Sequence, residues 1–133
     1  MYALILAMLL PFSSTVSDLT VKVSGCKTQK GQLYIALYDN KDLFPVFGKQ
    51  LRGEIVPLSK GKQFTFKKLR HKAYAIAVFH DLNSNGVLDK NPLGIPVEPY
   101  GFSRNARNTF SAPSFGQASF THSKTQTISI TVR

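Results

Sequence analysis

Apolar and polar residues alternate at a period of two along most of this chain. Residues 31–39 read GQLYIALYD, and residues 62–69 read KQFTFKKL. A period of two is typical of β-strands, because successive side chains of a strand point to opposite faces of the sheet. The helical period is nearly absent, although residues 40–50 could hold a helical turn. The pattern therefore predicts an all-β fold.

Short segments with this pattern recur between turn-forming residues. Those that we interpret as strands are residues 18–24, 31–39, 51–58, 62–69, 73–80, 118–121 and 127–132. Residues 31–39 and 73–80 are apolar on both faces, which indicates strands that are covered on both sides. Such an arrangement predicts a seven-stranded β-sandwich, immunoglobulin-like or transthyretin-like, with one long ordered loop over residues 81–116.

The length of 133 residues suits a single domain, which we place at residues 18–133. One cysteine is present, so an intramolecular disulfide and a cysteine-rich zinc module are excluded. That cysteine, Cys26, follows Val23-Ser24-Gly25, which is similar to a lipoprotein box. Asp18 and Lys22 separate it from the preceding apolar run, and we therefore interpret Cys26 as a lone thiol rather than a lipidation site.

The amino terminus has the pattern of a secretory signal peptide. Residues 3–12 read ALILAMLLPF, an apolar run too short to span a bilayer, and small residues follow up to Ser17. No basic residue precedes the run, and a buried first strand or helix is the alternative. We expect a signal peptide over residues 1–17, a periplasmic or secreted protein, and no transmembrane span once the peptide is removed.

The chain carries 17 Lys and Arg against 7 Asp and Glu, a formal net charge of +10. A strongly basic chain is typical of proteins that bind nucleic acids or anionic surfaces. The densest basic run, residues 60–72, contains Phe64 and Phe66, superficially like a base-stacking platform. Both fall at core-facing positions, and export would separate the protein from nucleic acid. We expect no nucleic acid, and instead an anionic envelope polymer or another envelope protein; a plainly solvated surface is the alternative.

The long loop opens with a calcium-type pattern, D-x-N-x-N-G-x-x-D, over residues 81–89. In such loops alternate oxygen-bearing side chains point at one centre, a glycine permits the sharp turn and the next residue offers its carbonyl. Hard oxygen ligands suit Ca²⁺. The ligands predicted from this spacing are Asp81, Asn83, Asn85, Val87 and Asp89.

The pattern departs from an EF-hand, because position twelve is Pro92 and no helix flanks the loop. A further ligand is needed, and Glu98 or Asn91 could supply it. We expect a structural rather than a catalytic Ca²⁺ ion, held weakly because few carboxylates contribute. The alternative is a turn held by side-chain hydrogen bonds without a metal.

Three separated segments resemble the bacterial secreted family of unknown function numbered two-one-four-one. They are YA-x-A-x-FHD-x-N-x-NG-x-x-D at residues 74–89, LGIP-x-E-x-YGFS at residues 93–103, and P-x-F-x-x-A-x-F at residues 113–120. The resemblance covers nearly the whole mature chain and implies a small exported β-sandwich domain without an established activity. Residues 70–72 depart from it, since the family commonly has a Pro/Gly turn there.

A catalytic interpretation of the same loop would join Ser103, His80 and Glu98 as a serine–histidine–acid triad. No G-x-S-x-G nucleophile elbow is present. We therefore expect His80 to orient the loop by hydrogen bonding.

The remaining polar residues of the loop have no single role. Glu98 and Tyr100 could line a pocket or hold the loop together, and Arg104 and Arg107 could hold an anionic group or be solvated. The favoured function is a binding or accessory module of the cell envelope. The alternative is a small hydrolase-like envelope enzyme that uses polar residues of the segment 80–103.

Overall fold

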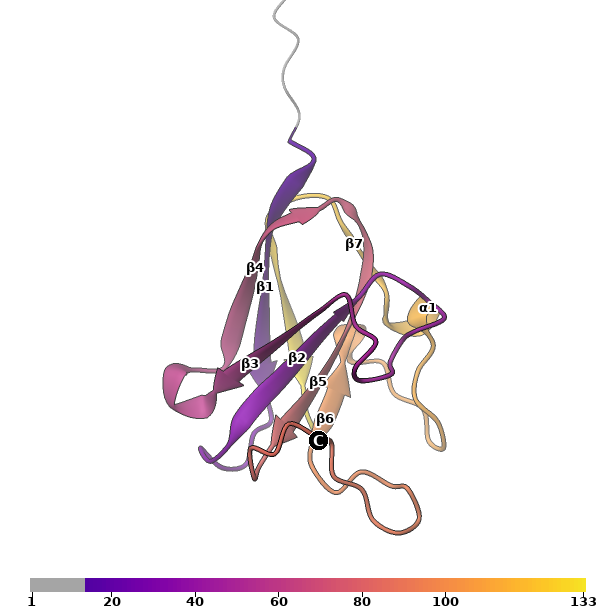
Figure 1. The fold of residues 1–133 in the computed structure, drawn as a ribbon. Coiled ribbons are helices and arrows are strands. Elements are labelled where there is room, and N and C mark those ends of the chain that lie inside the picture. Colours follow the sequence, from indigo (N-terminus) through magenta and orange to yellow (C-terminus); the bar gives the residue numbers. More distant parts are fainter. Residues whose placement is uncertain (1–13) are drawn as a thin grey trace, which may run out of the picture.

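The chain folds into two β-sheets that pack face to face, seen in a computed structural model that describes residues 14–133 (Figure 1). The smaller sheet has the strand order β4-β1-β8, in which β1 pairs antiparallel with β4 and parallel with β8. Its strands are β1 (Val16–Ser24), β4 (Gln63–Arg70) and β8 (Gln126–Thr131).

The larger sheet has the order β3-β2-β5-β6, and a short strand, β7, also pairs with β5. All of its pairings are antiparallel. Its strands are β2 (Gln32–Tyr38), β3 (Arg52–Pro57), β5 (Lys72–Asp81), β6 (Tyr100–Phe102) and β7 (Phe120–His122). The central strands β2 and β5 are those that the sequence predicts to be covered on both faces.

The main core lies between the two sheets. Alternation places Leu33, Ile35 and Leu37 of β2 on this face, where all three are fully buried. Phe66 of β4 is also fully buried, and Phe64 packs against the same cluster. The aromatic pair of the basic run is thus part of the core, and the predicted β-sandwich is confirmed.

The structure has eight strands where the sequence predicts seven. The additional strand, β6, lies inside the predicted loop 81–116 and pairs with β5 over only three residues. A strand of three residues is too short to show an alternation of apolar and polar residues in the sequence. The same segment holds the short helices η2 (Ser103–Asn105) and α1 (Phe115–Ala118), and η1 (Leu58–Lys60) precedes β4. Residues 40–50 form turns and no helix.

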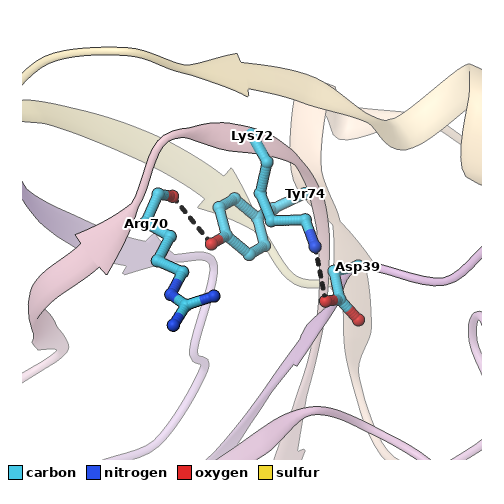
Figure 2. A network of polar contacts seen from close by, with 4 residues as sticks. All are labelled: Asp39, Arg70, Lys72 and Tyr74. Atoms are coloured by element: carbon cyan, nitrogen blue, oxygen red, sulfur yellow. Dashed lines mark hydrogen bonds and ion pairs between the residues drawn. The ribbon is translucent and has the colours of Figure 1, made fainter. Parts of the chain in front are cut away.

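The connection between β4 and β5, where the family resemblance departs, is a tight corner (Figure 2). The hydroxyl of Tyr74 donates to the carbonyl oxygen of Arg70 at 2.7 Å. The ammonium of Lys72 forms an ion pair with Asp39 at 2.9 Å, which links the start of β5 to the residue after β2. Side chains rather than a Pro/Gly turn therefore hold this corner.

Most of the predicted signal peptide lies outside the described residues, because the description begins at residue 14. β1 begins at Val16, where Val16 pairs with Arg70 and Ser17 with Leu69. Within residues 14–133, no helix is long and apolar enough to cross a membrane.

Candidate functional site

The loop between β5 and β6 begins at a buried carboxylate, Asp81. Oδ2 of Asp81 accepts hydrogen bonds from Nε2 of Gln32 at 2.9 Å and from the backbone N–H of Gly86 at 2.7 Å. Oδ1 accepts from the backbone N–H of Asn85 at 3.2 Å. A buried charge is tolerated where such donors replace water. Asp81 therefore fixes the first turn of the loop to the end of the sheet.

Asp89 is bonded by the two asparagine side chains of the calcium-type pattern. Nδ2 of Asn83 donates to Oδ2 of Asp89 at 2.8 Å, and Nδ2 of Asn85 donates to Oδ1 at 2.9 Å. The hydrogen bonds from Asn85 and Asn83 hold the pKa of the Asp89 carboxyl below its usual range. The amide oxygens accept backbone N–H groups, Asn83 from Asn85 and Asn85 from the exposed Val87.

The carboxylate of Glu98 holds this loop together by accepting two of its backbone N–H groups. Its side chain is buried, with 5% exposure. Oε2 accepts the N–H of Leu82 at 2.6 Å, and Oε1 accepts the N–H of Asp89 at 2.9 Å. One carboxylate thereby joins the second and ninth positions of the loop. Of the two roles that the sequence leaves open for Glu98, the structure places it as the residue that holds the loop together.

In the part of the chain that the structure describes, no cationic side chain forms an ion pair with these three carboxylates. Among residues 14–133 the ion pairs are Arg52–Glu54 and Lys72–Asp39, neither of which involves the loop. The described chain also contains no group of three or more His, Cys, Asp or Glu side chains placed to hold a metal ion. As arranged, the predicted ligands form a hydrogen-bonded network, and the amides of Asn83 and Asn85 would have to turn their oxygens inward to bind Ca²⁺.

The candidate triad residues have separate partners in the described chain. Nε2 of His80 lies 2.6 Å from the carbonyl oxygen of Lys30, whereas Nδ1 is buried without a partner. Ser103 is fully buried, and its hydroxyl accepts the N–H of Ile76 and donates to the carbonyl oxygen of Ala118 at 2.6 Å. Glu98 bonds the loop backbone, so no hydrogen bond joins the three side chains.

His80 and Asp81 point to opposite faces of the sheet. Ile76 and Val78 belong to the core between the sheets, and alternation along β5 places His80 on that same face. Asp81 is on the face that the loop covers. The side chain of His80 forms no hydrogen bond with the loop among the described residues, because its Nε2 contacts the carbonyl oxygen of Lys30, before β2. The backbone N–H of His80 does reach the loop, since it donates to the carbonyl oxygen of Pro99 at 2.8 Å.

The outer face of the larger sheet carries a second apolar cluster. Ala36 and Tyr38 of β2, Ala77 of β5 and its pairing partner Phe102 of β6 belong to this cluster, together with Phe44 from the segment after β2. Their cover comes from two segments, residues 40–50 and residues 103–118, which lie over this sheet in Figure 1. Burial among these groups raises the pKa of Tyr38 above its usual range. The sheet is thus buried on both faces, as its apolar central strands require.

A pocket of about 540 Å³ opens at the edge of this second cluster. Its walls come from three segments that are distant in the sequence and from β6. The apolar lining residues are Pro45, Phe47, Leu88, Ile95, Pro96, Tyr100, Phe102, Phe110 and Ala112. The polar lining residues are Lys90, Asn108, Thr109 and Ser111, and Lys90 is the charged residue among the lining residues.

Tyr100 lies at this pocket and is contacted by Arg107, whereas Arg104 is not among the lining residues. Tyr100 lines the pocket, and the guanidinium of Arg107 lies 4.7 Å from the centre of its ring. Arg107 also donates to the carbonyl oxygen of Tyr100 at 3.0 Å. Arg104 is exposed and has a left-handed backbone conformation, with φ of 59°. The structure therefore holds Arg107 over the pocket wall and leaves Arg104 at the surface.

Sequence reasoning missed the pocket because its walls meet only in three dimensions. Pro45 and Phe47 belong to the segment that we read as a helical turn, and residues 108–112 have no motif. The aromatic content of the segment 81–116 was the available signal, and it indicated an ordered loop rather than a cavity.

Comparison with known proteins places most of the chain in one family. Residues 21–130 match the family described as an uncharacterized protein conserved in bacteria, DUF2141. Neither the curated proteins nor the solved structures gave a match. The matched range includes both sheets, the loop from Asp81 to Glu98 and the pocket.

Proposed function

The chain belongs to the family of uncharacterized proteins conserved in bacteria, DUF2141, and we propose that it is an exported binding module of the cell envelope. The observation that carries the proposal is the pocket of about 540 Å³ on the outer face of the larger sheet. Small-molecule sites usually enclose about 300–1,000 Å³, with mostly apolar walls and a few polar groups. The lining residues have this composition, and the ligand class is a small apolar or amphiphilic molecule.

Two observations favour binding over the alternative, a hydrolase-like envelope enzyme. The hydroxyl of Ser103 is buried and bonded to backbone groups, so it is not presented to a substrate. The pocket is lined by no carboxylate and no histidine, the groups that general acid–base catalysis uses most often. The periplasmic or secreted location rests on the apolar run at residues 3–12, and the net charge of +10 favours anionic envelope partners.

A fluorescent apolar probe tests the pocket directly. We expect N-phenyl-1-naphthylamine to bind saturably with increased fluorescence, because the pocket shields it from water. Ala112→Trp places a bulky side chain in the pocket and should weaken probe binding about tenfold or more, which corresponds to about 1.4 kcal/mol. The matched control is Thr125→Trp, at an exposed turn before β8. If Ala112→Trp and Thr125→Trp bound the probe with equal affinity, the probe would not bind in the pocket, and the proposal would lose its support.

Calcium is the second element of the proposed function, as a structural ion of the loop that borders the pocket. Asp81, Asp89 and Glu98 are gathered in one loop of a strongly basic chain, and none has an ion pair among the described residues. A cation would offset their mutual repulsion. Binding exchanges the hydrogen bonds from Asn83 and Asn85 to Asp89 for oxygen ligation, so the affinity is expected to be weak, with Kd in the millimolar range.

A calcium titration of thermal stability checks this element. With Kd of about 1 mM, about 10 mM Ca²⁺ should stabilise the fold by about 1.4 kcal/mol and raise Tm by roughly 5 °C. Asp89→Asn should abolish this rise, whereas Asp42→Asn, at an exposed turn, should retain it. An unchanged Tm in the wild-type protein, with Mg²⁺ as the ionic-strength control, would leave the loop as a purely hydrogen-bonded turn.

A further inference from the structure

We propose that the mouth of the pocket is a membrane-docking surface, which binds the face of an anionic lipid bilayer. The surface consists of four exposed apolar side chains, Leu93, Ile95, Val97 and Phe110, which we name the rim patch, together with Lys90 at the pocket and Arg107 over the ring of Tyr100. This inference goes beyond the proposed function, because it concerns a surface and a partner that do not depend on a ligand inside the pocket.

The rim patch is unusually exposed for apolar side chains. Phe110 is 100% exposed and Leu93 is 83% exposed, while Ile95 and Val97 are more than half exposed. Single exposed apolar residues are common on soluble proteins, but a group of them marks an interaction surface. Burying these side chains in the headgroup region of a bilayer would remove their apolar area from water.

The local backbone holds the patch together. Asn91 donates to the carbonyl oxygen of Ile95 at 2.9 Å, and Val97 donates to that of Asp89 at 2.9 Å, so residues 89–97 form a hairpin-like loop. Ile95 and Val97 flank Pro96, which forms an isolated β-bridge with Lys90. Ile95 and Phe110 line the same pocket. In Figure 1 the loop before β6 extends below the ends of β5 and β6, and the loop before α1 lies at the right, below α1.

The charges around the rim patch favour an anionic surface. Lys90 is exposed and lines the pocket, and the exposed Arg107 lies over the ring of Tyr100, another lining residue. The acidic residues nearby are the buried Glu98 and the half-buried Asp89, whose carboxylate accepts hydrogen bonds from Asn83 and Asn85. A second copy of this chain, with a net charge of +10, would bring like charges together. An anionic bilayer attracts each basic residue near its surface and accepts the apolar side chains between them.

Vesicle sedimentation tests the proposal. The full chain is mixed with vesicles of equal parts phosphatidylcholine and phosphatidylglycerol, or of phosphatidylcholine alone, and the bound fraction is measured. We expect binding to the anionic vesicles that weakens with salt, and little binding to the neutral ones. Leu93→Ser should weaken binding about tenfold, since an inserted aliphatic group is lost. Ile55→Ser is the matched control, because Ile55 is 52% exposed on β3, away from the patch.

Variants that remove one positive charge distinguish binding through the rim patch from a general attraction of the basic protein to anionic vesicles. Lys90→Ala and Lys67→Ala remove the same charge, but Lys90 lies at the pocket and Lys67 is exposed on β4 of the other sheet. We expect Lys90→Ala to weaken vesicle binding about fivefold and Lys67→Ala to weaken it much less. Equal losses, or wild-type binding by Leu93→Ser, would overturn the proposal. A dimer in sedimentation that Leu93→Ser converts to monomer would assign the patch to a second copy instead.

A failure of the membrane-docking proposal can be distinguished from a failure of the proposed ligand binding. Leu93 does not line the pocket, so Leu93→Ser should bind N-phenyl-1-naphthylamine with wild-type affinity in the absence of vesicles.

Discussion

Gly31→Ala is expected to lower the free energy of unfolding by about 3 kcal/mol or more. Gly31 lies directly before β2 and has a φ of +78°, a conformation that disfavours residues with a Cβ. A Cβ at this position would overlap the carbonyl oxygen of Asp81 and come within 2.9 Å of the Cα of Leu82. Both are backbone atoms, so no side-chain rotation relieves the overlap and the end of β5 must move.

Gly94→Ala separates this crowding from the cost of the backbone conformation. Gly94 has a φ of +79°, almost the same as that of Gly31, but a Cβ there would meet open space. The left-handed conformation alone costs an alanine about 1–2 kcal/mol. Urea denaturation of both variants gives the comparison. If Gly31→Ala and Gly94→Ala lowered the free energy of unfolding equally, the close approach of Gly31 to Asp81 would contribute nothing to the loss.

Glu98→Gln is expected to destabilise the loop and the fold by about 2–4 kcal/mol. The two carboxylate oxygens of Glu98 each accept a backbone N–H, from Leu82 and from Asp89. Glutamine keeps the shape but replaces one oxygen with an NH₂ group, which faces a donor and leaves a buried N–H unsatisfied. The charge that strengthens the remaining hydrogen bond is lost as well.

Two measurements check the role of Glu98. Denaturation reports the loss of global stability, and amide hydrogen exchange at Leu82 and Asp89 reports local opening of the loop. Glu54→Gln is the matched control, because Glu54 is partly exposed and paired with Arg52 at 3.0 Å on the edge strand. That variant should change stability by about 0.5 kcal/mol or less. If the amide hydrogen exchange rates of Leu82 and Asp89 were unchanged in Glu98→Gln, the role of Glu98 in holding the loop together would be contradicted.

These variants concern the same junction, where the end of β5 passes into the loop. Asp81 is hydrogen-bonded to Gln32 in β2, and Gly31 packs against its carbonyl group. Glu98 joins the loop two residues before β6. A shift of this junction would displace Leu88 and Lys90 at the pocket wall. The loop network therefore supports the pocket, and loss of Glu98 should affect probe binding as well as stability.

Much of the fold could be predicted because the decisive signal is local. A strand covered on both faces is apolar along most of its length, and β2 and β5 carry that pattern up to the buried His80 and Asp81 at the end of β5. The main core follows from it, since Leu33, Ile35 and Leu37 fall on one face whatever the partner strands are. The three-residue strand β6 could not be predicted, because its pairing with β5 depends on a contact between residues far apart in the chain.

The arrangement of the loop after β5 also depends on a local signal. The spacing of residues 81–89 gathers its oxygen-bearing side chains through local turns, and the structure does bring Asp81, Asn83, Asn85 and Asp89 into one hydrogen-bonded loop. Glu98 joins them although it is nine residues beyond Asp89. Whether a cation enters that loop is the question for the calcium titration.

Local patterning thus accounts for the all-β class, the buried central strands and the acidic loop on a basic chain, because each depends on neighbouring residues alone. Long-range packing accounts for the rest. The fold brings Nε2 of His80 to the carbonyl oxygen of Lys30, and the hydroxyl of Ser103 forms a buried link between Ile76 and Ala118. The pocket exists because segments more than sixty residues apart in the chain, which contain Phe47 and Phe110, line one cavity on the outer face of the larger sheet.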